Sequence, residues 1–478
     1  MVQSLAVPDS DALRVKVSGA LAPDRKSSLG QFMTPSIIAR FMAALFDDPV
    51  RPASLLDAGA GIGSLTIAAV ARLGNIASVD AWEIDALMQT HLRQTLTLLQ
   101  VEYQVHAEDF IPSAVQQIAL ANGRRYTHAI LNPPYAKLNS NSIHRALLRK
   151  VGIETVNLYT AFVALAVLLM QTEGELVAII PRSFCNGPYY RPFRQLILKH
   201  CSLDRIHVFE SRTNAFKDDD VLQENVIIKL VRGKKQGDVV VSSSHDQRMA
   251  DYSARTVPFS GIVKPADPEV FIHIPTRHHN SERDAHLFRH SLEEIGLEVC
   301  TGPVVDFRVS AHWLSEPLEH SIPLVYPHHF STGKLVYPKP HKKPNALVND
   351  PSLRPWLMKN DWYVLVKRFS SKEERRRIVG YVYNPAEIPT DWIGFENHWN
   401  VIHSQHRGID PVLAKGLVCF LNSTVLDKHF RVFSGHTQVN ATDLRNMKYP
   451  RRDVITSWGE RYRDNLTQAE IDALIEQA

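Results

Sequence analysis

The chain has 478 residues, of which 44% are hydrophobic and 4 are cysteines, and its formal net charge at pH 7 is +4. This composition excludes global disorder, and four widely separated cysteines exclude a disulfide scaffold and a zinc ribbon. The small positive charge permits a nucleic-acid partner without requiring one, and the length predicts roughly two to four domains.

The first half of the chain predicts an α/β domain. Short apolar runs alternate with helical patterns, which predicts a mainly parallel sheet covered by helices on both faces. The expected strands are Ser54–Leu56, Ser78–Trp82, Thr127–Leu131, Glu175–Ile180, Asp204–Phe209 and Val226–Leu230. The expected helices are Ser64–Ala71, Leu87–Leu99, Ala114–Ala121, Tyr159–Gln171 and Tyr190–His200.

The longest apolar stretch, Leu158–Met170, is shorter than the roughly 20 residues of a membrane span and predicts a buried core helix. The first twenty residues contain no apolar run of the kind found in a signal peptide. We therefore expect no membrane association and a cytoplasmic location.

The second half of the chain has a different pattern. The segment Gly233–Gly237 predicts a linker, and the residues after it are rich in proline, histidine and aromatics. This pattern predicts a mixed α+β domain with many loops. Near the C-terminus, Thr467 and Glu470 form a capping box for a helix that ends at Glu476. The expected division is an N-terminal arm at 1–27, a first domain at 28–235, a second domain at 236–452 and a tail at 453–478.

A glycine loop follows the first expected strand. Gly59, Gly61 and Gly63 allow the backbone to approach a ligand closely, and the next helix supplies free N–H donors at its start. The Gly-x-Gly-x-Gly spacing differs from the dinucleotide fingerprint. Asp57 precedes the loop, and its carboxylate suits the amino group of a nucleoside that carries an amino acid. The alternative is an ordinary tight turn.

Acidic residues also follow the next two strands of the sheet. Glu83 is placed to accept hydrogen bonds from a ribose diol. Asp109 suits the exocyclic amine of adenine, and Phe110 could cover the purine face. The alternative is that these are surface acids without a ligand. Together with the glycine loop, the acids predict S-adenosylmethionine as cofactor.

The box Asn132-Pro133-Pro134-Tyr135 ends another expected strand. The prolines fix the path of the backbone, so the Asn132 amide oxygen and the Pro133 carbonyl can converge as two acceptors. Two acceptors can take hydrogen bonds from both N–H groups of an amine attached to an aromatic ring, which frees the lone pair of its nitrogen. Tyr135 offers a flat face on which a base can stack. The alternative is a turn that only ends a strand.

Three motifs occur in the order Gly30–Met42, Asp57–Gly63 and Asn132–Tyr135. In this order they resemble the gamma-class DNA N6-adenine methyltransferases of type II restriction–modification systems. The resemblance implies a Rossmann-like, S-adenosylmethionine-dependent methyltransferase domain followed by a target-recognition domain, which Gly416–Leu444 also resembles. It further implies a cofactor role for Gln31, Phe32, Thr34 and Pro35, and a place for Phe216 on the second face of a flipped adenine.

The second domain is then expected to bind double-stranded DNA. Contacts to phosphate need basic side chains, and amide side chains can read adenine edges. The candidates for phosphate are Lys342, Lys343, Lys367, Arg368 and Arg431, and those for base edges are Gln438 and Asn440. The alternative for each is a solvated surface. The histidines between His273 and His341 match no ligand spacing, so no metal is expected.

These motifs predict a site-specific DNA methyltransferase that modifies the N6 amine of a flipped adenine. The resemblance implies a bacterial or archaeal cell and a separate cognate restriction endonuclease that acts on the same site. Glutamine and RNA-base methyltransferases share the Asn132–Tyr135 box, but they usually lack the Gln31–Pro35 segment and the large second domain. A non-catalytic DNA-binding specificity protein is a further alternative, and the intact box argues against it.

Overall fold

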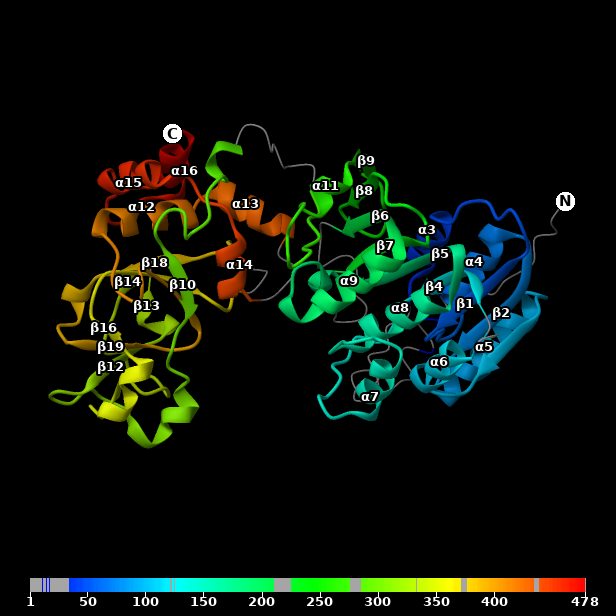
Figure 1. Cartoon of the computed structure of the whole chain (residues 1–478), viewed down its shortest axis with the longest axis horizontal. Coiled ribbons are helices and arrows are strands. Elements are labelled where there is room, and N and C mark those ends of the chain that lie inside the picture. Colours follow the sequence, from blue (N-terminus) through cyan, green and yellow to red (C-terminus); the bar gives the residue numbers. More distant parts are fainter. Residues whose placement is uncertain are drawn as a thin grey trace. The chain divides into compact units, whose positions relative to one another are not determined.

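The computed structural model of the chain describes residues 11, 14, 17, 34–120, 123, 125–209, 225–275, 285–331, 333–370, 376–433 and 438–477. Contacts within the chain divide it into unit 1, Met1–Thr276, and unit 2, Arg277–Ala478. Figure 1 labels many of the helices and strands of both units. No helix in the described ranges has both the length and the apolar character needed to cross a bilayer.

Unit 1 is built on a nine-stranded sheet with the strand order β3-β2-β1-β4-β5-β7-β6-β8-β9. Strands β1 to β5 pair in parallel, whereas β7 is antiparallel to both of its neighbours. The strands are β1 (Ala53–Ala58), β2 (Ile76–Trp82), β3 (Tyr103–His106), β4 (Tyr126–Leu131), β5 (Met170–Pro181), β6 (Cys201–Phe209), β7 (Asn225–Arg232), β8 (Val239–Ser244) and β9 (Ser253–Val257).

Helices cover both faces of this sheet because successive strand residues point to opposite sides. Leu55 belongs to a buried cluster with side chains of α3, α4 and α5, whereas Leu56 belongs to a cluster with α6, α8 and α9. The helices are α3 (Ser36–Ala44), α4 (Ser64–Leu73), α5 (Ala86–Leu98), α6 (Phe110–Ala119), α7 (Ile143–Lys150), α8 (Leu158–Leu169), α9 (Arg191–His200) and α11 (Phe259–Ile262).

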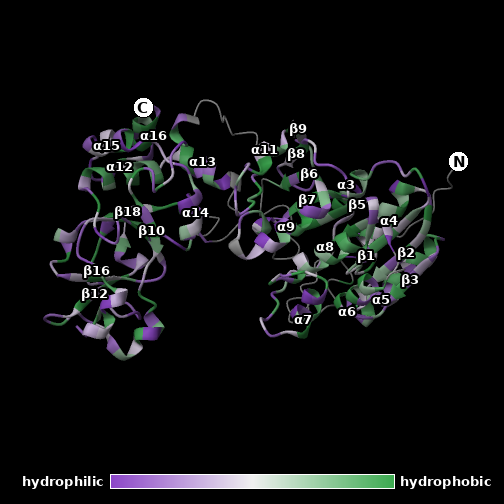
Figure 2. Cartoon of the chain, viewed as in Figure 1, coloured by the Kyte–Doolittle hydropathy of each residue, from purple (hydrophilic) through white to green (hydrophobic). Residues whose placement is uncertain are grey.

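The predicted α/β class of the first half is confirmed, and the expected strands and helices lie within the observed elements or within two residues of their ends. The apolar stretch that begins at Leu158 forms α8, which is buried on almost every side, as expected of a helix that is hydrophobic all round. Figure 2 shows this helix and the neighbouring strands as hydrophobic.

The end of unit 1 differs from the expected boundary at residue 235. Strand β8 pairs in parallel with β6, and β9 pairs with β8, so the sheet continues beyond the expected linker Gly233–Gly237. That segment is therefore a connection within the sheet. Strand β8 pairs with the edge of β6 that faces away from β7, which satisfies backbone groups that an edge strand would leave unpaired.

The N-terminal residues that the structure describes are tied to unit 1, in contrast to the loose arm expected. Val17 and Arg14 are buried, with 3% and 7% of their surface exposed. Asp11 accepts hydrogen bonds from the backbone N–H of Ser36 at 3.0 Å and from its hydroxyl at 2.5 Å. These contacts hold the start of α3.

Unit 2 is a mixed α+β unit with two main sheets and a layer of helices. The sheet orders are β10-β20-β17-β18 and β11-β15-β12-β19-β16, and β13 pairs with β14. The strands are β10 (Glu298–Thr301), β11 (Trp313–Leu314), β12 (Ile322–Val325), β13 (Phe330–Ser331), β14 (Lys334–Leu335), β15 (Ala346–Leu347), β16 (Met358–Lys359), β17 (Tyr363–Lys367), β18 (Gly380–Tyr383), β19 (Trp392–Phe395) and β20 (Trp399–His403).

The helices of unit 2 include the segment that was expected to be a tail. Ile455, Trp458, Leu474 and Ile475 share a buried cluster with side chains of α12, so the segment 453–477 packs onto the core of unit 2. Thr467 caps α16 with Glu470, as predicted. The helices are α12 (Pro411–Leu421), α13 (Thr424–Phe433), α14 (Ala441–Asn446), α15 (Arg452–Glu460) and α16 (Gln468–Glu476).

Short 3₁₀ helices complete the two units. They are η1 (Arg182–Cys185), η2 (Pro188–Tyr190), η4 (Ala285–Leu287), η5 (Asp306–His312), η6 (Pro327–His329), η7 (Pro351–Trp356) and η8 (Pro385–Glu387).

Candidate active site

The carboxyl ends of β1, β2 and β4 meet at a cavity of about 290 Å³ in unit 1. Because these strands are parallel, Gly59, Glu83 and Asn132, which follow them, lie at the same edge of the sheet. The strand order reverses between β1 and β4: β2 and β3 follow on one side of β1, and β4 and β5 follow on the other. Open α/β sheets bind ligands at such a point of reversal. The wall is formed by Thr34, Gly59, Ala60, Gly61, Ile62, Ser64, Leu65, Trp82, Glu83, Ile84, Met88, Glu108, Asp109, Phe110, Asn132, Pro134, His144, Leu158 and Phe162.

The glycine loop is held against the end of β2. Its three glycines have positive φ angles of 82°, 58° and 89°, a region that side chains with a Cβ rarely occupy. The N–H groups of Gly59 and Ala60 both donate to the Trp82 carbonyl at 2.9 Å. Gly63 caps α4, and a Cβ there would meet a Leu92 methyl at 3.0 Å. The loop therefore needs glycine for both its turn and its packing.

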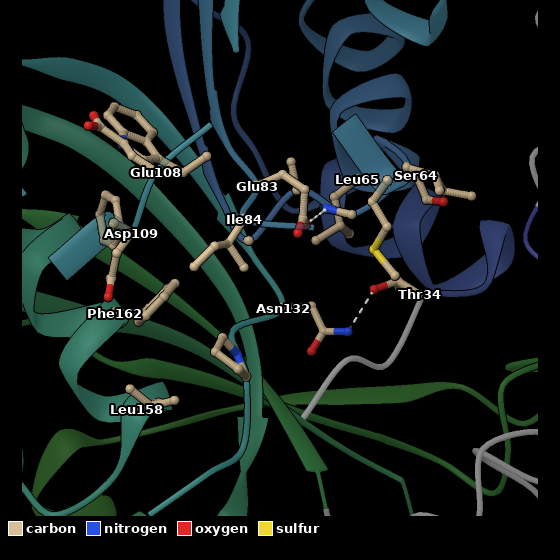
Figure 3. Close-up of a pocket in the computed structure, with 18 of the residues that line it drawn as sticks. Thr34, Ser64, Leu65, Glu83, Ile84, Glu108, Asp109, Asn132, Leu158 and Phe162 are labelled. Carbon is tan, nitrogen blue, oxygen red and sulfur yellow. Dashed lines mark hydrogen bonds between the residues drawn. The ribbon is translucent and has the colours of Figure 1, made fainter. Parts of the chain in front are cut away.

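Glu83 is fixed by backbone donors on both carboxylate oxygens. Its Oε2 accepts from the Gly61 N–H, and its Oε1 accepts from the Asp85 N–H, each at 2.8 Å. Burial raises the pKa of this carboxyl. Figure 3 shows the Glu83 side chain among those that line the cavity. A carboxylate can accept about four hydrogen bonds, so capacity remains for ligand hydroxyls.

Asp109 and Phe110 form another part of the wall. Asp109 Oδ1 accepts from the Ile111 N–H at 2.9 Å, and Oδ2 lies 2.6 Å from His144 Nε2. The Phe110 ring centroid lies 5.1 Å from that of Phe162. Two rings and the Ile84 side chain therefore give the cavity an apolar portion next to a carboxylate.

The Asn132–Tyr135 box reaches the cavity through Asn132, which Figure 3 shows with its amide toward Thr34. Asn132 Nδ2 donates to Thr34 Oγ1 at 3.0 Å, and Asn132 Oδ1 accepts from the Tyr135 hydroxyl at 2.9 Å. The same hydroxyl lies 3.3 Å from the Ile179 carbonyl oxygen. Burial raises the pKa of Tyr135, so the phenol keeps the proton that it donates.

Asp57 lies behind the cavity. Its side chain is fully buried, its Oδ2 accepts from Thr66 Oγ1 at 2.6 Å, and its Oδ1 has no hydrogen-bond partner. Burial, together with the nearby Glu83 carboxylate, raises the pKa of Asp57 to about 7. The structure does not bring Asp57 to the cavity wall, so the geometry gives no direct support to the expected contact with a ligand amino group.

Half of the residues predicted for the catalytic and cofactor sites meet at one cavity. Those on its wall are Thr34, Gly59, Gly61, Glu83, Asp109, Phe110, Asn132 and Pro134. Others lie beside these residues in the chain without forming the wall: Pro35, Asp57, Gly63, Pro133 and Tyr135. Gln31, Phe32 and Phe216 lie outside the described residues.

Sequence reasoning did not identify several wall residues. Ser64 begins α4 immediately after the glycine loop, and that position is a signal that could have found it. His144 and Phe162 come from α7 and α8, and no local motif marks them.

Two curated relatives match almost the whole chain. Type II methyltransferase M.BsuBI of Bacillus subtilis is 51% identical over 471 residues, which cover 95% of this chain and 94% of that protein. Type II methyltransferase M.PstI of Providencia stuartii is 43% identical over 487 residues, which cover 98% and 96%. This chain belongs to the type II methyltransferases. The family model of the Eco57I restriction-modification methylase matches residues 78–216 of this methyltransferase. The predicted family is therefore confirmed.

Solved structures share the fold of the methyltransferase at low sequence identity. A nuclease-deletion mutant of the type ISP restriction-modification enzyme LlaGI has a TM-score of 0.55 and 10% identity, with coverage of 94% of this chain and 48% of that one. The structure of a DrdV–DNA complex has a TM-score of 0.52 and 12% identity, with coverage of 94% and 58%. The chain thus matches about half of the length of these larger chains.

The predicted DNA contacts lie in two parts of unit 2 of the methyltransferase. Lys342 is exposed, whereas Lys343 Nζ forms an ion pair with Asp306 at 2.5 Å. Lys367 ends β17 and Arg368 follows it, and the Arg368 carbonyl accepts from the Val439 N–H at 2.8 Å. This bond places Gln438 and Asn440, on either side of Val439, near the two basic residues.

Two of the predicted contacts have structural roles within unit 2. Arg431 Nε pairs with Asp427 Oδ2 at 2.6 Å on α13. The backbone N–H of Asn440 donates to Asp443 Oδ2 at 2.8 Å at the start of α14.

An exposed aromatic ring, Phe369, lies among these residues and was not predicted. It is 46% exposed and forms a β-bridge with Gln438. The Arg368 guanidinium lies 6.0 Å from the ring centroid, and the His398 ring lies 4.8 Å away. We call Lys367, Arg368, Phe369 and Gln438 the Phe369 patch. Across the part of the chain that the structure describes, no group of His, Cys, Asp and Glu is arranged to hold a metal ion.

Proposed function

We propose that this methyltransferase transfers a methyl group from S-adenosylmethionine to the N6 amine of an adenine flipped out of double-stranded DNA. The observation that carries the proposal is the position of Asn132 on the cavity wall, directly after β4 and within one cavity with the glycine loop and Glu83. An amide acceptor of this kind suits an amine that must be made nucleophilic.

The residues of the cavity fit the proposed cofactor. The Oγ of Ser64 is buried without a hydrogen-bond partner at the start of α4, where free N–H groups favour a carboxylate. Glu83 would accept from the ribose hydroxyls and Asp109 from the adenine amine. Phe110 and Phe162 would contact the purine. Gln31, Phe32, Thr34 and Pro35 are proposed to close the site at the other end.

The chemistry follows from the groups that would surround the target amine. When bound, S-adenosylmethionine supplies an electrophilic methyl group. The Asn132 amide oxygen and the Pro133 carbonyl would accept the two N–H groups of adenine, which draws its nitrogen toward tetrahedral geometry and frees the lone pair. Tyr135, with Phe216, would stack on the flipped base. No covalent intermediate with the protein is needed.

Unit 2 is proposed to bind the duplex. The Phe369 patch combines basic side chains with a base-reading amide and an exposed ring, which suits phosphate and base contacts. Lys342 would add a phosphate contact from a different loop. Lys343 and Arg431 are weaker candidates because Asp306 and Asp427 already pair with their charged groups.

We further infer that the enzyme acts in the cytoplasm and protects DNA from a separate cognate restriction endonuclease. Both points rest on the membership of the chain in the type II methyltransferases. A plasmid methylated by the enzyme should resist one member of a panel of type II endonucleases. Cleavage by every member at all of its sites would contradict this part of the proposal for those sites.

The product of the reaction tests the main proposal. The purified chain would be incubated with plasmid DNA and S-adenosylmethionine that carries an isotope-labelled methyl group, and the DNA would be digested to nucleosides for mass spectrometry. We expect labelled N6-methyldeoxyadenosine. Label in a methylated cytosine would refute the choice of base, and label in RNA or in a protein glutamine instead of DNA would refute the substrate class.

A further inference from the structure

The amide of Asn132 is held from two sides by hydroxyl groups. Thr34 Oγ1 accepts from Asn132 Nδ2 at 3.0 Å, and the Tyr135 hydroxyl donates to Asn132 Oδ1 at 2.9 Å. Thr34 lies 98 residues before Asn132 in the chain, so only the fold brings the two together. Figure 3 shows the bond between Thr34 and Asn132. The terminal torsion of an asparagine side chain has broad minima, so the orientation of its amide depends on such partners.

Thr34 is itself held firmly by the segment that follows it. Only 4% of its surface is exposed, and it precedes Pro35, which restricts its backbone to extended geometry. Pro35 then leads into α3, whose Ile38 and Met42 side chains have no exposed surface. The hydroxyl of Thr34 is therefore fixed relative to the sheet.

The N-terminal region contributes to the same arrangement. Asp11 accepts hydrogen bonds from the backbone N–H and the hydroxyl of Ser36, two residues after Thr34. The α3 side chains also share a buried cluster with Leu55 of β1 and Ile130 of β4, the strand that ends immediately before Asn132. A continuous set of contacts thus connects Asp11, Ser36 and α3 to the catalytic amide.

We propose that Thr34 is a positioning residue for methyl transfer, in addition to its proposed place in the cofactor site. Its hydroxyl holds the Asn132 side-chain nitrogen, which turns the amide oxygen of the same group toward the target amine. The carbonyl oxygen has a second lone pair, so it can accept from the amine while Tyr135 donates to it. This inference rests on the proposed function, because it assumes that Asn132 accepts from the amine.

The test separates the rate of methyl transfer from the affinity for the cofactor. Thr34→Val keeps the shape of the side chain and removes the hydroxyl, whereas Thr34→Ser keeps the hydroxyl and is the matched control. With saturating S-adenosylmethionine and DNA, we expect the single-turnover rate of Thr34→Val to fall about 10- to 100-fold, because a small misplacement of a catalytic group has an effect of this size. Thr34→Ser should stay within about threefold of the wild-type rate.

Cofactor affinity provides the second readout. The affinity of Thr34→Val for S-adenosylhomocysteine, measured by calorimetry, should stay within about threefold of the wild-type value, while the rate falls. If affinity falls and the saturated rate is unchanged, Thr34 only binds the cofactor and the inference is wrong. An unchanged rate and affinity would also overturn it.

If Thr34→Val does not fold, Thr34→Ala also removes the hydroxyl, should show the same fall in rate, and would overturn the inference if its rate were unchanged. A further variant tests the hydroxyl on the other side of the amide. Tyr135→Phe removes the other hydroxyl from Asn132 and keeps the ring for stacking. We expect a slower transfer rate with unchanged base flipping, read from 2-aminopurine fluorescence at the target position. An unchanged rate for Tyr135→Phe would overturn the inference that hydroxyl groups on both sides of the Asn132 amide position it.

Asn132→Ala, measured in parallel, distinguishes failure of the proposed function from failure of the inference about Thr34. Normal transfer by Asn132→Ala would refute the proposed role of Asn132, and the inference about Thr34 would fall with it. An inactive Asn132→Ala beside a fully active Thr34→Val would refute the role of Thr34 alone.

Discussion

The cavity of unit 1 and the Phe369 patch of unit 2 hold their functional side chains in different ways. In unit 1, both oxygens of Glu83 accept backbone N–H groups, and the Asn132 amide is held by two hydroxyls. In unit 2, Arg368 donates one N–H group to the Asn397 carbonyl, and Phe369 remains nearly half exposed.

This comparison separates two kinds of requirement. A group that meets a reacting atom must be fixed by several partners before the substrate arrives. A group that meets DNA needs charge or ring surface that its own unit leaves accessible. Lys343 and Arg431 meet the second requirement less well, because acids of unit 2 pair with them.

The largest effect is expected at Asn132. Asn132→Ala removes an acceptor for the target amine, and loss of one such preorganised group costs about 10²–10³ in rate. The rate of label transfer to DNA measures this loss, and calorimetry with S-adenosylhomocysteine should show nearly unchanged affinity. Asn141→Ala, at an exposed position that does not form the cavity wall, is the control and should keep the wild-type rate.

The next effect concerns Asp57 and the stability of unit 1. Its folded pKa of about 7 lies above the value of an unfolded aspartate, so the folded state binds the proton more tightly. The free energy of unfolding therefore falls as the pH rises from about 4 to about 7 and stays low above that range. Asp57→Asn cannot ionise and should lack this fall in the free energy of unfolding, a difference on the order of 4 kcal/mol.

Hydrogen exchange can locate that effect. At pH 8, peptides from β1 and α4 should be better protected from exchange in Asp57→Asn than in the wild type. At pH 5 this difference in protection between the two proteins should be smaller. Peptides from α12, in unit 2, serve as the internal reference and should not change between the two proteins. An equal change in both units would contradict an origin at Asp57.

A smaller effect is expected when the exposed ring of the patch is removed. Phe369→Ala should weaken DNA binding by about 1–3 kcal/mol if the ring stacks on a base. Phe369→Trp should restore affinity, and Phe307→Ala, at another exposed ring of unit 2, is the matched control. Equal losses for Phe369→Ala and Phe307→Ala would show that the patch has no special role.

The smallest effect is expected in the salt dependence of DNA binding. Arg368→Ala should lower the slope of log affinity against log salt by about 1, as expected for one phosphate contact. Arg431→Ala should change the slope little because Asp427 already pairs with Arg431. Equal slopes for the two variants would contradict the distinction between paired and available cations.

Residues that directly follow a strand could be predicted from the sequence. The glycine loop, Glu83 and Asn132 have this position, and parallel strands bring their carboxyl ends to one edge whatever the details of packing. The same rule extends to Asp109, shortly after β3. Motif spacing and strand alternation were therefore sufficient for the cofactor edge and the α/β class.

The limits of unit 1 could not be predicted in this way. Strand β8 contains three consecutive serines, and its residues pair with β6 rather than beginning a new domain. Sequence composition changes at Gly233–Gly237, but composition does not report which backbone pairs with which. The edge of a sheet is defined by partners that are distant in the sequence.

Local motifs and strand periodicity are short-range properties, so the sequence was enough to predict which residues line the candidate site and their order along the sheet. The groups that hold these residues came only from the fold. Thr34 and Asn132 meet across 98 residues, and His144 meets Asp109 across 35. It also decided which cations of unit 2 are paired, since a charge is offset by its neighbours in space and not by those in sequence.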